Sequence, residues 1–179
     1  MSRTKPKPVA LTIAGSDSSG GAGLQADLST FTALGVHGVS VVTAITAQTS
    51  KKVLGIERVK PIAVSKQLEA VFAGRKPRAA KTGMLLTAGA VECVAEFFNE
   101  KKRPPLVVDP VIISTSGTEL LRPSAIRVLK KRLLPLATIV TPNVPEAELF
   151  TGLSIREPED MRTAARKLFD QFGCPSVVT

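Results

Sequence analysis

The chain has 179 residues, 44% hydrophobic and 22% charged, which is typical of a soluble globular protein. No apolar run reaches the ~20 residues of a membrane-spanning helix, and the run after the basic start is too short for a secretory signal, so we expect a cytoplasmic protein with no membrane partner. The net charge of +9 favours anionic ligands such as nucleotides, but without Trp or Tyr no stacking platform for nucleic acid is visible, and none is expected as a partner.

The first predicted elements surround a glycine-rich turn. The apolar, β-branched run Val9–Ala14 predicts a buried strand, and four glycines among small polar residues follow it. A helical pattern with Leu24, Leu28 and Phe31 at i, i+4 and i+7 comes next. Such a turn leaves backbone N–H groups at a helix N-terminus, where an anion or polar ligand can bind.

Asp27 falls between the apolar residues of this helix, where an unpaired carboxylate is costly. Two interpretations stay open. Either Asp27 is a first-turn acid satisfied by the helix end and nearby N–H groups, or it faces a pocket beside the glycine turn.

The rest of the chain alternates strands and helices. Predicted strands are 39–45, 53–59, 79–84, 106–111, 137–140 and a last one beginning at Ser176–Thr179. Predicted helices are 64–72 ending at Gly74, 88–98 with Val91, Val94, Ala95 and Phe98 inward, 123–134, 144–150, and 158–172 with Met161, Ala165, Leu168 and Phe172 on one face. We therefore expect residues 1–179 to form one α/β domain with three αβα layers and a mostly parallel sheet, after a flexible start over residues 1–8.

Polar residues stand at the carboxyl ends of these strands, where parallel sheets bind ligands. They are Gly15–Gly23, Gln48, Gly83–Met84, Asp109 and Asn143–Glu146. Taken singly, Asp109 and Asn143 are also turn formers beside prolines, and Glu146 is a helix-start acid. Taken together at one edge, their oxygens suit Mg²⁺ and nucleotide phosphates.

Several known motifs are excluded. No Gly-Lys-Ser/Thr follows the glycine turn, its spacing does not fit a dinucleotide fingerprint, and no Gly-x-Ser-x-Gly elbow occurs. The single histidine, His37, follows the helix-ending Gly35 and is interpreted as a surface residue. Cys93 and Cys174 fit a reducing compartment and give no metal-ligand spacing.

The chain resembles the hydroxymethylpyrimidine/phosphomethylpyrimidine kinases of thiamine biosynthesis, within the ribokinase-like superfamily. The residues that carry the resemblance are Thr12–Asp27, Ala44–Thr49, Lys81–Met84, Val107–Val111 and Thr141–Glu146. It implies a ribokinase-like fold and an ATP- and Mg²⁺-dependent kinase that phosphorylates the hydroxymethyl group of 4-amino-5-hydroxymethyl-2-methylpyrimidine and then the monophosphate.

The resemblance also implies residue roles. It places Gly15, Asp27, Gln48 and Met84 in the pyrimidine pocket, with Thr46 as a weaker candidate. Gln48 offers both a donor and an acceptor to an aminopyrimidine edge, and Met84 offers adaptable apolar surface. Asn143 and Glu146 match an Asn-x-x-Glu element that governs Mg²⁺ and phosphate binding, and Asp109 is expected near that metal.

The chain departs from the family pattern in one respect. The family's catalytic base and most of its ATP pocket lie in a C-terminal third, in a glycine-rich turn that this chain does not contain. In the pyrimidine kinases that this chain resembles, the candidate base is a cysteine in that turn; Cys174 is not in that motif and is not assigned the role. We therefore expect the chain to correspond to the N-terminal two-thirds, with the base beyond Thr179, and to be inactive or nearly so alone.

Two alternatives stay open at this point. A pyridoxal or pyridoxine kinase on the same fold accepts a similar hydroxymethyl-bearing heterocycle, and Thr46 and Gln48 would distinguish the two substrates. The other alternative is a non-catalytic module that binds the pyrimidine. Relatives commonly self-associate, so we expect a homo-oligomer, a dimer, in which the strand at 53–59 pairs across subunits.

Overall fold

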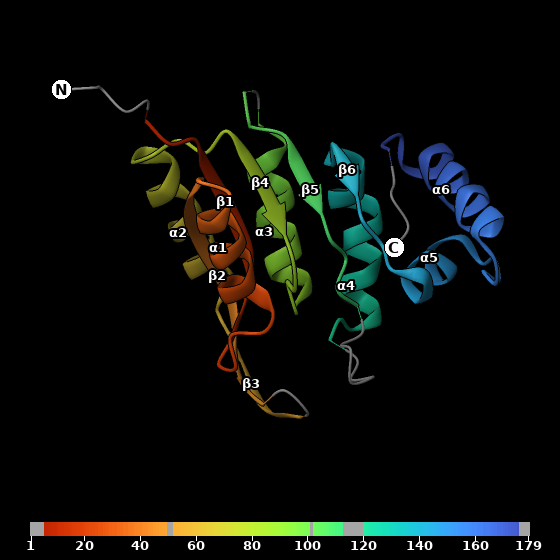
Figure 1. The fold of residues 1–179 in the computed structure, drawn as a ribbon, viewed down its shortest axis with the longest axis horizontal. Helices are drawn as coiled ribbons and strands as arrows, with labels where there is room; N and C mark the ends of the chain where they lie inside the picture. Colours follow the sequence, from red (N-terminus) through yellow and green to blue (C-terminus); the bar gives the residue numbers. More distant parts are fainter. Residues whose placement is uncertain (1–5, 50–51, 101, 113–119, 176–179) are drawn as a thin grey trace.

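The computed structural model describes residues 6–49, 52–100, 102–112 and 120–175. Within them, six strands form one sheet in the order β3-β2-β1-β4-β5-β6, parallel throughout except for β3 (Figure 1). The strands are β1 (Val9–Asp17), β2 (His37–Gln48), β3 (Val53–Arg58), β4 (Ala79–Thr82), β5 (Leu106–Val108) and β6 (Ile139–Val140). The helices are α1 (Gly23–Ala33), α2 (Pro61–Ala73), α3 (Ala88–Phe98), α4 (Pro123–Val128), α5 (Val144–Thr151) and α6 (Pro158–Phe172). The predicted α/β class and mostly parallel sheet are confirmed.

Helices cover both faces of the sheet. α1 packs on β1 and β2, whereas α2, α3 and α4 lie side by side on the opposite face (Figure 1). The strand order explains this, because the chain moves from β1 to β2 through α1 and then returns through α2 to β4 on the other side of β1. Right-handed crossovers that run in opposite directions place their helices on opposite faces. The direction in which successive strands are added to the sheet reverses at β1, and a crevice opens there at the carboxyl ends of the strands.

The main core lies between the sheet and the layer of α2, α3 and α4. On α3, the residues predicted to point inward are all buried, namely Val91, Val94, Ala95 and Phe98. Thr87 caps this helix, since its side chain accepts the Ala90 amide. On α6, the most buried residues are Ala164 and Leu168. The inward face is therefore rotated slightly from the predicted stripe.

Prolines account for two differences from the predicted elements. β5 ends at Val108 rather than at residue 111, because Pro110 cannot donate to a strand neighbour. The helix predicted over 123–134 is α-helical only to Val128, continues as a π-helix over Leu129–Leu133 and ends as a 3₁₀ turn. Pro135 lacks an N–H group and its ring would clash with the carbonyl four residues earlier, so the regular helix cannot continue.

The end of β2 pairs with β3 to form a ribbon, and its outer part, Ala47–Gln48 with Val53–Gly55, extends past the other strands (Figure 1). The last pair between β1 and β2 joins Asp17 and Thr46, and beyond it β2 has only β3 as a neighbour. β2 is an internal strand as predicted, but Ile45 is 55% exposed rather than buried. The predicted short strand at 53–59 is confirmed as β3.

Two predictions concern the ends of the chain. The strand predicted at Ser176–Thr179 lies outside the described residues, as do residues 1–5 of the start expected to be flexible. Pro175 is described, and its carbonyl oxygen accepts the Val140 amide at 3.0 Å.

Candidate functional site

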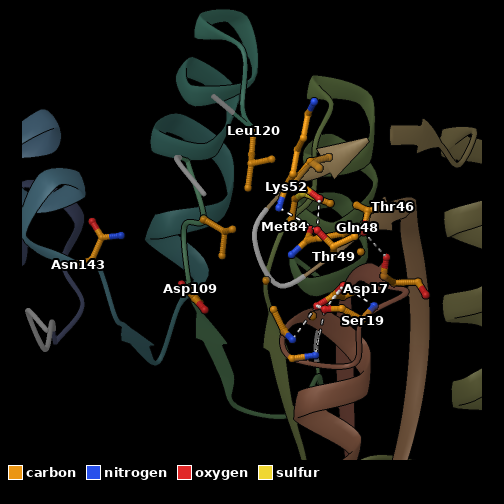
Figure 2. A pocket seen from close by; sticks show the side chains of 18 of the residues that line it. Asp17, Ser19, Thr46, Gln48, Thr49, Lys52, Met84, Asp109, Leu120 and Asn143 are labelled. Atoms are coloured by element: carbon orange, nitrogen blue, oxygen red, sulfur yellow. Dashed lines mark hydrogen bonds between the residues drawn. The ribbon is translucent and has the colours of Figure 1, made fainter. Parts of the chain in front are cut away.

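A cavity of about 610 Å³ opens at the carboxyl ends of β1, β2, β4 and β5. Figure 2 shows its lining side chains, with Asp17 and Ser19 from the glycine turn, Thr46 and Gln48 from β2, and Asp109 and Asn143 from the later strand ends. Seven of the residues selected from the sequence line this cavity: Gly15, Thr46, Gln48, Met84, Asp109, Asn143 and Glu146. Residues from both halves of the chain therefore share one crevice.

Asp17 organises the glycine turn. It is only 4% exposed, and its carboxylate accepts the Ser19 and Ala22 amides, both at 2.9 Å, and the Ser19 hydroxyl. Gln25 closes the turn from α1, where its side chain accepts the Asp17 amide and donates to the Ser16 hydroxyl, both at 2.8 Å. Asp17 thus occupies some of the amides that the sequence suggested for a ligand, and it fixes the turn in one shape.

Glycine is required where the turn meets β1. Gly23 has φ +57°, and a Cβ there would clash with the Gly15 carbonyl oxygen. A Cβ on Gly15 would meet the Met84 methyl group. The Met84 backbone is fixed in turn, because its carbonyl accepts the Thr43 hydroxyl at 2.6 Å. The floor of the cavity is therefore a close packing of β1 against the segment after β4.

Backbone contacts hold the two β2 residues at the cavity. The Gln48 amide donates to the Ser18 hydroxyl at 2.8 Å, and that hydroxyl donates to the Gln48 carbonyl at 2.9 Å. Thr46 is buried, and its hydroxyl donates to the Ser16 carbonyl at 3.0 Å. The Gln48 backbone is engaged in this way, while its side chain lines the cavity (Figure 2).

Asp27 lies behind the cavity wall and is not among its lining residues. Its Oδ2 accepts the Thr12 hydroxyl at 2.6 Å and lies 3.2 Å from the Lys81 ammonium. Lys81 does line the cavity, and it is also 3.5 Å from Asp109 Oδ2. The carboxylate is satisfied by a hydroxyl and a cation, which neither sequence interpretation named.

Burial raises the pKa of Asp109 above its usual value. The Lys81 ammonium opposes this effect, while the nearby Asp27 charge adds to it. Lys81 is thus shared by two acids that repel each other.

Asn143 and Glu146 begin α5 as a reciprocal cap. The Asn143 side chain accepts the Glu146 amide at 2.9 Å, and Glu146 Oε2 accepts the Asn143 amide at 3.1 Å. Glu146 Oε1 also accepts the Ile112 amide at 2.8 Å. Burial raises the pKa of Glu146; the two amide hydrogen bonds oppose this and the Asp109 charge adds to it.

The acids at this edge have the donor chemistry that Mg²⁺ prefers. Asp109 and Glu146 both line the cavity, and the charge of one raises the pKa of the other. A cation near both would relieve that repulsion. Within the described ranges, no cluster of three or more His, Cys, Asp or Glu side chains is placed to hold a metal. Two carboxylates fit Mg²⁺, which keeps several water ligands and commonly shares phosphate oxygens.

Neither cysteine reaches the cavity. The Cys93 thiol on α3 contacts the Pro61 carbonyl at 3.4 Å, and Cys174 is buried in the main core. Burial raises the pKa of both thiols.

None of the helices in the described parts of the chain is long and apolar enough to span a membrane.

Several lining residues were given no individual role from the sequence, among them Asp17, Lys81 and Val111. Asp17 and Lys81 each carried a weak signal. Asp17 is an acid followed by Ser and Gly, a combination typical of a turn that binds its own backbone. Lys81 is a charged residue inside a predicted strand of a mostly parallel sheet, where most side chains are buried. Val111 follows a proline, but nothing in the sequence indicates its unusual backbone conformation.

Comparison with known proteins gives consistent matches. The family model described as "Phosphomethylpyrimidine kinase" matches residues 17–179. The chain is 47% identical over 163 residues to the hydroxymethylpyrimidine/phosphomethylpyrimidine kinase of Synechococcus elongatus, covering 91% of this chain and 62% of that protein. It is 50% identical over 163 residues to the thiamine biosynthesis bifunctional protein ThiED of Geobacter sulfurreducens, covering 91% of this chain and 33% of that protein. The chain thus spans less than two thirds of the length of these curated relatives.

Solved structures agree with the sequence matches. The phosphomethylpyrimidine kinase from Clostridium difficile 630 superposes with a TM-score of 0.88 at 46% identity, covering 96% of this chain and 74% of that one. A pyridoxal kinase from Staphylococcus aureus in complex with pyridoxal superposes with a TM-score of 0.85 at 35% identity, covering 97% and 63%.

Proposed function

Because the chain belongs to the phosphomethylpyrimidine kinase family, we propose that it binds 4-amino-5-hydroxymethyl-2-methylpyrimidine for ATP-dependent phosphorylation of the hydroxymethyl group and then of the monophosphate, in thiamine biosynthesis. One observation carries the proposal. The glycine turn, Gln48 and Met84 share a cavity with the acid pair Asp109 and Glu146. A heterocycle and a metal-bound phosphate would meet there.

Each site residue selected from the sequence has a proposed role. The side-chain carboxamide of Gln48 hydrogen-bonds to the aminopyrimidine edge, and Met84 covers the ring above Gly15. Thr46 and Asp27 support the pocket through Ser16 and Lys81. Asn143, Asp109 and Glu146 serve the phosphate and the metal. Bound Mg²⁺ would supply positive charge to the transferring phosphate, and Asp109 and Glu146 would hold it there.

Binding of the pyrimidine is the direct test of this proposal. Isothermal titration should give 1:1 binding, and Gln48→Ala should weaken it roughly 10-fold, because the lost hydrogen bonds are worth about 1 kcal/mol or more. Gln171→Ala, at an exposed position on α6, is the matched control and should bind like the wild-type chain. Tighter binding of pyridoxal than of the pyrimidine would instead support the pyridoxal kinase alternative.

We also propose that residues 1–179 bind the pyrimidine without turning it over. The family's candidate base is a cysteine, and in the part of the chain that the structure describes neither Cys93 nor Cys174 reaches the cavity. An ATP-consumption assay with the pyrimidine should therefore show no substrate-dependent turnover by this chain. Robust turnover would contradict this proposal and leave the binding proposal intact. Binding without turnover by any longer form of the protein would support a non-catalytic module.

Finally, we propose that the β2–β3 ribbon contacts a second copy of the chain to form a dimer. β3 is an edge strand, and Ile45 and Leu54 on the ribbon are 55% and 67% exposed. Sedimentation velocity should show a dimer that Leu54→Lys weakens, because a charge would replace apolar contact area. A monomeric wild-type chain at micromolar concentration would refute the proposal.

A further inference from the structure

The described residues between β5 and α4 contribute to two hydrophobic clusters. A small pocket cluster consists of Ala44, Met84 and Leu120 with the partly buried Ile56, Leu86 and Val111. The main core contains Ile112 and Leu121. Consecutive residues therefore face different clusters, with Val111 and Leu120 in the cavity wall and Ile112 and Leu121 in the core.

This change between clusters requires an unfavourable backbone conformation at Val111. Its φ is +44°, in the left-handed region that a β-branched residue rarely occupies. Among the described residues, only three non-glycine residues have positive φ, and two of them, Leu86 and Val111, belong to the pocket cluster. Such conformations persist only where neighbouring contacts hold them.

Hydrogen bonds hold both backbone polar groups of the next residue, Ile112. The Ile112 amide donates to Glu146 Oε1 at 2.8 Å, and the Ile112 carbonyl accepts the Leu120 and Leu121 amides at 2.8 and 3.2 Å. Glu146 is itself 2% exposed and fixed by the Asn143 amide. Among the described residues, the Glu146 carboxylate at the start of α5 is thus the only side chain that hydrogen-bonds to this bend.

We infer that Glu146 is a positioning residue for the pyrimidine pocket, which it supports by holding the Ile112 amide and, through it, the bend that places Val111 and Leu120 in the cavity wall. This inference rests on the proposed function and adds to the metal role proposed for Glu146. A residue that acted only through a bound metal would not affect pyrimidine binding when metal and nucleotide are both absent. Glu146 should affect it under those conditions.

The test measures pyrimidine binding in EDTA without nucleotide. Glu146→Gln keeps the shape of the side chain but replaces one accepting oxygen with an NH₂ group, so the side chain can no longer accept the Ile112 and Asn143 amides together. It should weaken pyrimidine binding by about 10-fold or more, the loss that corresponds to one buried hydrogen bond. Glu148→Gln is the matched control, because Glu148 lies on the same helix and accepts the Ile155 amide at 2.7 Å away from the cavity. It should change the Kd by less than about 2-fold, since no cavity-wall residue depends on that bond.

The same substitution is also made in a Val111→Gly variant, in case Glu146→Gln alone fails to fold. Glycine accepts positive φ readily, so in Val111→Gly the bend needs less support. Adding Glu146→Gln to Val111→Gly should then weaken binding by less than about 3-fold relative to Val111→Gly alone. A loss in this background as large as in the wild-type background would overturn the inference.

The remaining outcomes are also decisive. Equal pyrimidine affinity of the wild-type chain and Glu146→Gln in EDTA would overturn the positioning role and leave the proposed function standing. Equal weakening by Glu146→Gln and Glu148→Gln would overturn it too, because a general loss of stability would then explain both. No pyrimidine binding by the wild-type chain would overturn the proposed function and this role together.

Discussion

Lys81 gives one positive charge to two carboxylates, and this arrangement makes Asp109 an unfavourable group in the folded protein. Its ammonium lies 3.2 Å from Asp27 and 3.5 Å from Asp109. Asp27 also receives the Thr12 hydroxyl, whereas burial and the charge of Asp27 raise the pKa of Asp109. Folding therefore favours the protonated form of Asp109, as is common for residues kept for binding rather than for stability.

Asp109→Asn should accordingly stabilise the protein at neutral pH. A raised carboxyl pKa means that the contribution of Asp109 to stability is fully present below its unfolded value of 3.8 and is lost as pH rises through the folded value. The variant should gain up to about 1 kcal/mol at pH 7, a limit set by solvent screening of a carboxylate that is one third exposed, and the gain should vanish below pH 3.8.

Urea unfolding between pH 3 and pH 7 measures this difference. Asp170→Asn, at an exposed position on α6, is the control and should follow the wild-type curve throughout. A loss of stability in Asp109→Asn at pH 7 would mean that the ion pair with Lys81 outweighs burial.

At the same scale, the sequence predicted the acids better than it predicted the residues that hold them. Asp109 and Glu146 follow buried strands, and strand ends of a parallel sheet meet at one edge. Lys81 lies within a predicted strand, and linear spacing does not reveal that it stands between Asp27 and Asp109. Its role follows from the lateral order of strands, which depends on tertiary structure.

The packing of α1 on β2 depends on a glycine within the strand. A Cβ on Gly38 would lie 2.6 Å from Leu28 Cδ2 and 3.1 Å from Phe31 Cδ2. These two side chains are part of the apolar pattern that predicted α1, and they can approach the sheet because residue 38 has no side chain. Element boundaries were predictable from such patterns, but this contact was not.

Gly38→Ala should therefore lower the free energy of unfolding by about 1–2 kcal/mol, because Leu28 and Phe31 must move to make room. Gly55→Ala is the matched control in β3, where a Cβ meets no atom within 4 Å and φ is not positive. Gly55→Ala should be neutral or slightly stabilising. Chemical denaturation of both variants decides the point, and equal losses would show that strand glycines matter here for reasons other than the α1 contact.

Irregular helices and bends limited the sequence-based prediction of elements. The caps at Asn143 and Gly152 agree with the predicted start and end of α5, since local hydrogen bonding determines both. Pro135 explains why the regular helix stops, but not the π-helical turn before it, which packs against α3. The bend at Val111 does not follow from local pattern, because it is held by Glu146, a residue distant in the chain that accepts the Ile112 amide.

At the scale of the molecule, the apolar side chains of the described residues form two separate clusters, and we expect one to serve stability and the other binding. The main core joins the sheet to α2, α3 and α4, whereas the pocket cluster lies at the strand ends around the cavity. The reversal of strand order at β1 produces this separation, because it opens a crevice at one edge and leaves the rest of the sheet covered. The fold class made that crevice predictable from the sequence, but not which leucines line it.

A leucine-to-alanine substitution should therefore mainly lower stability in the main core and mainly weaken pyrimidine binding in the pocket cluster. Leu133→Ala, in the main core at 0% exposure, should cost about 2–5 kcal/mol of unfolding free energy and leave the pyrimidine Kd unchanged wherever the protein is folded. Leu120→Ala, in the pocket cluster at 8% exposure, should cost less stability, because its small cluster can collapse into the cavity. It should weaken pyrimidine binding roughly 5- to 10-fold, since about 1 kcal/mol of apolar contact with the ring is lost. Urea denaturation and isothermal titration on the two variants test this, and a pyrimidine Kd that shifts equally in both would show that the two clusters respond as one.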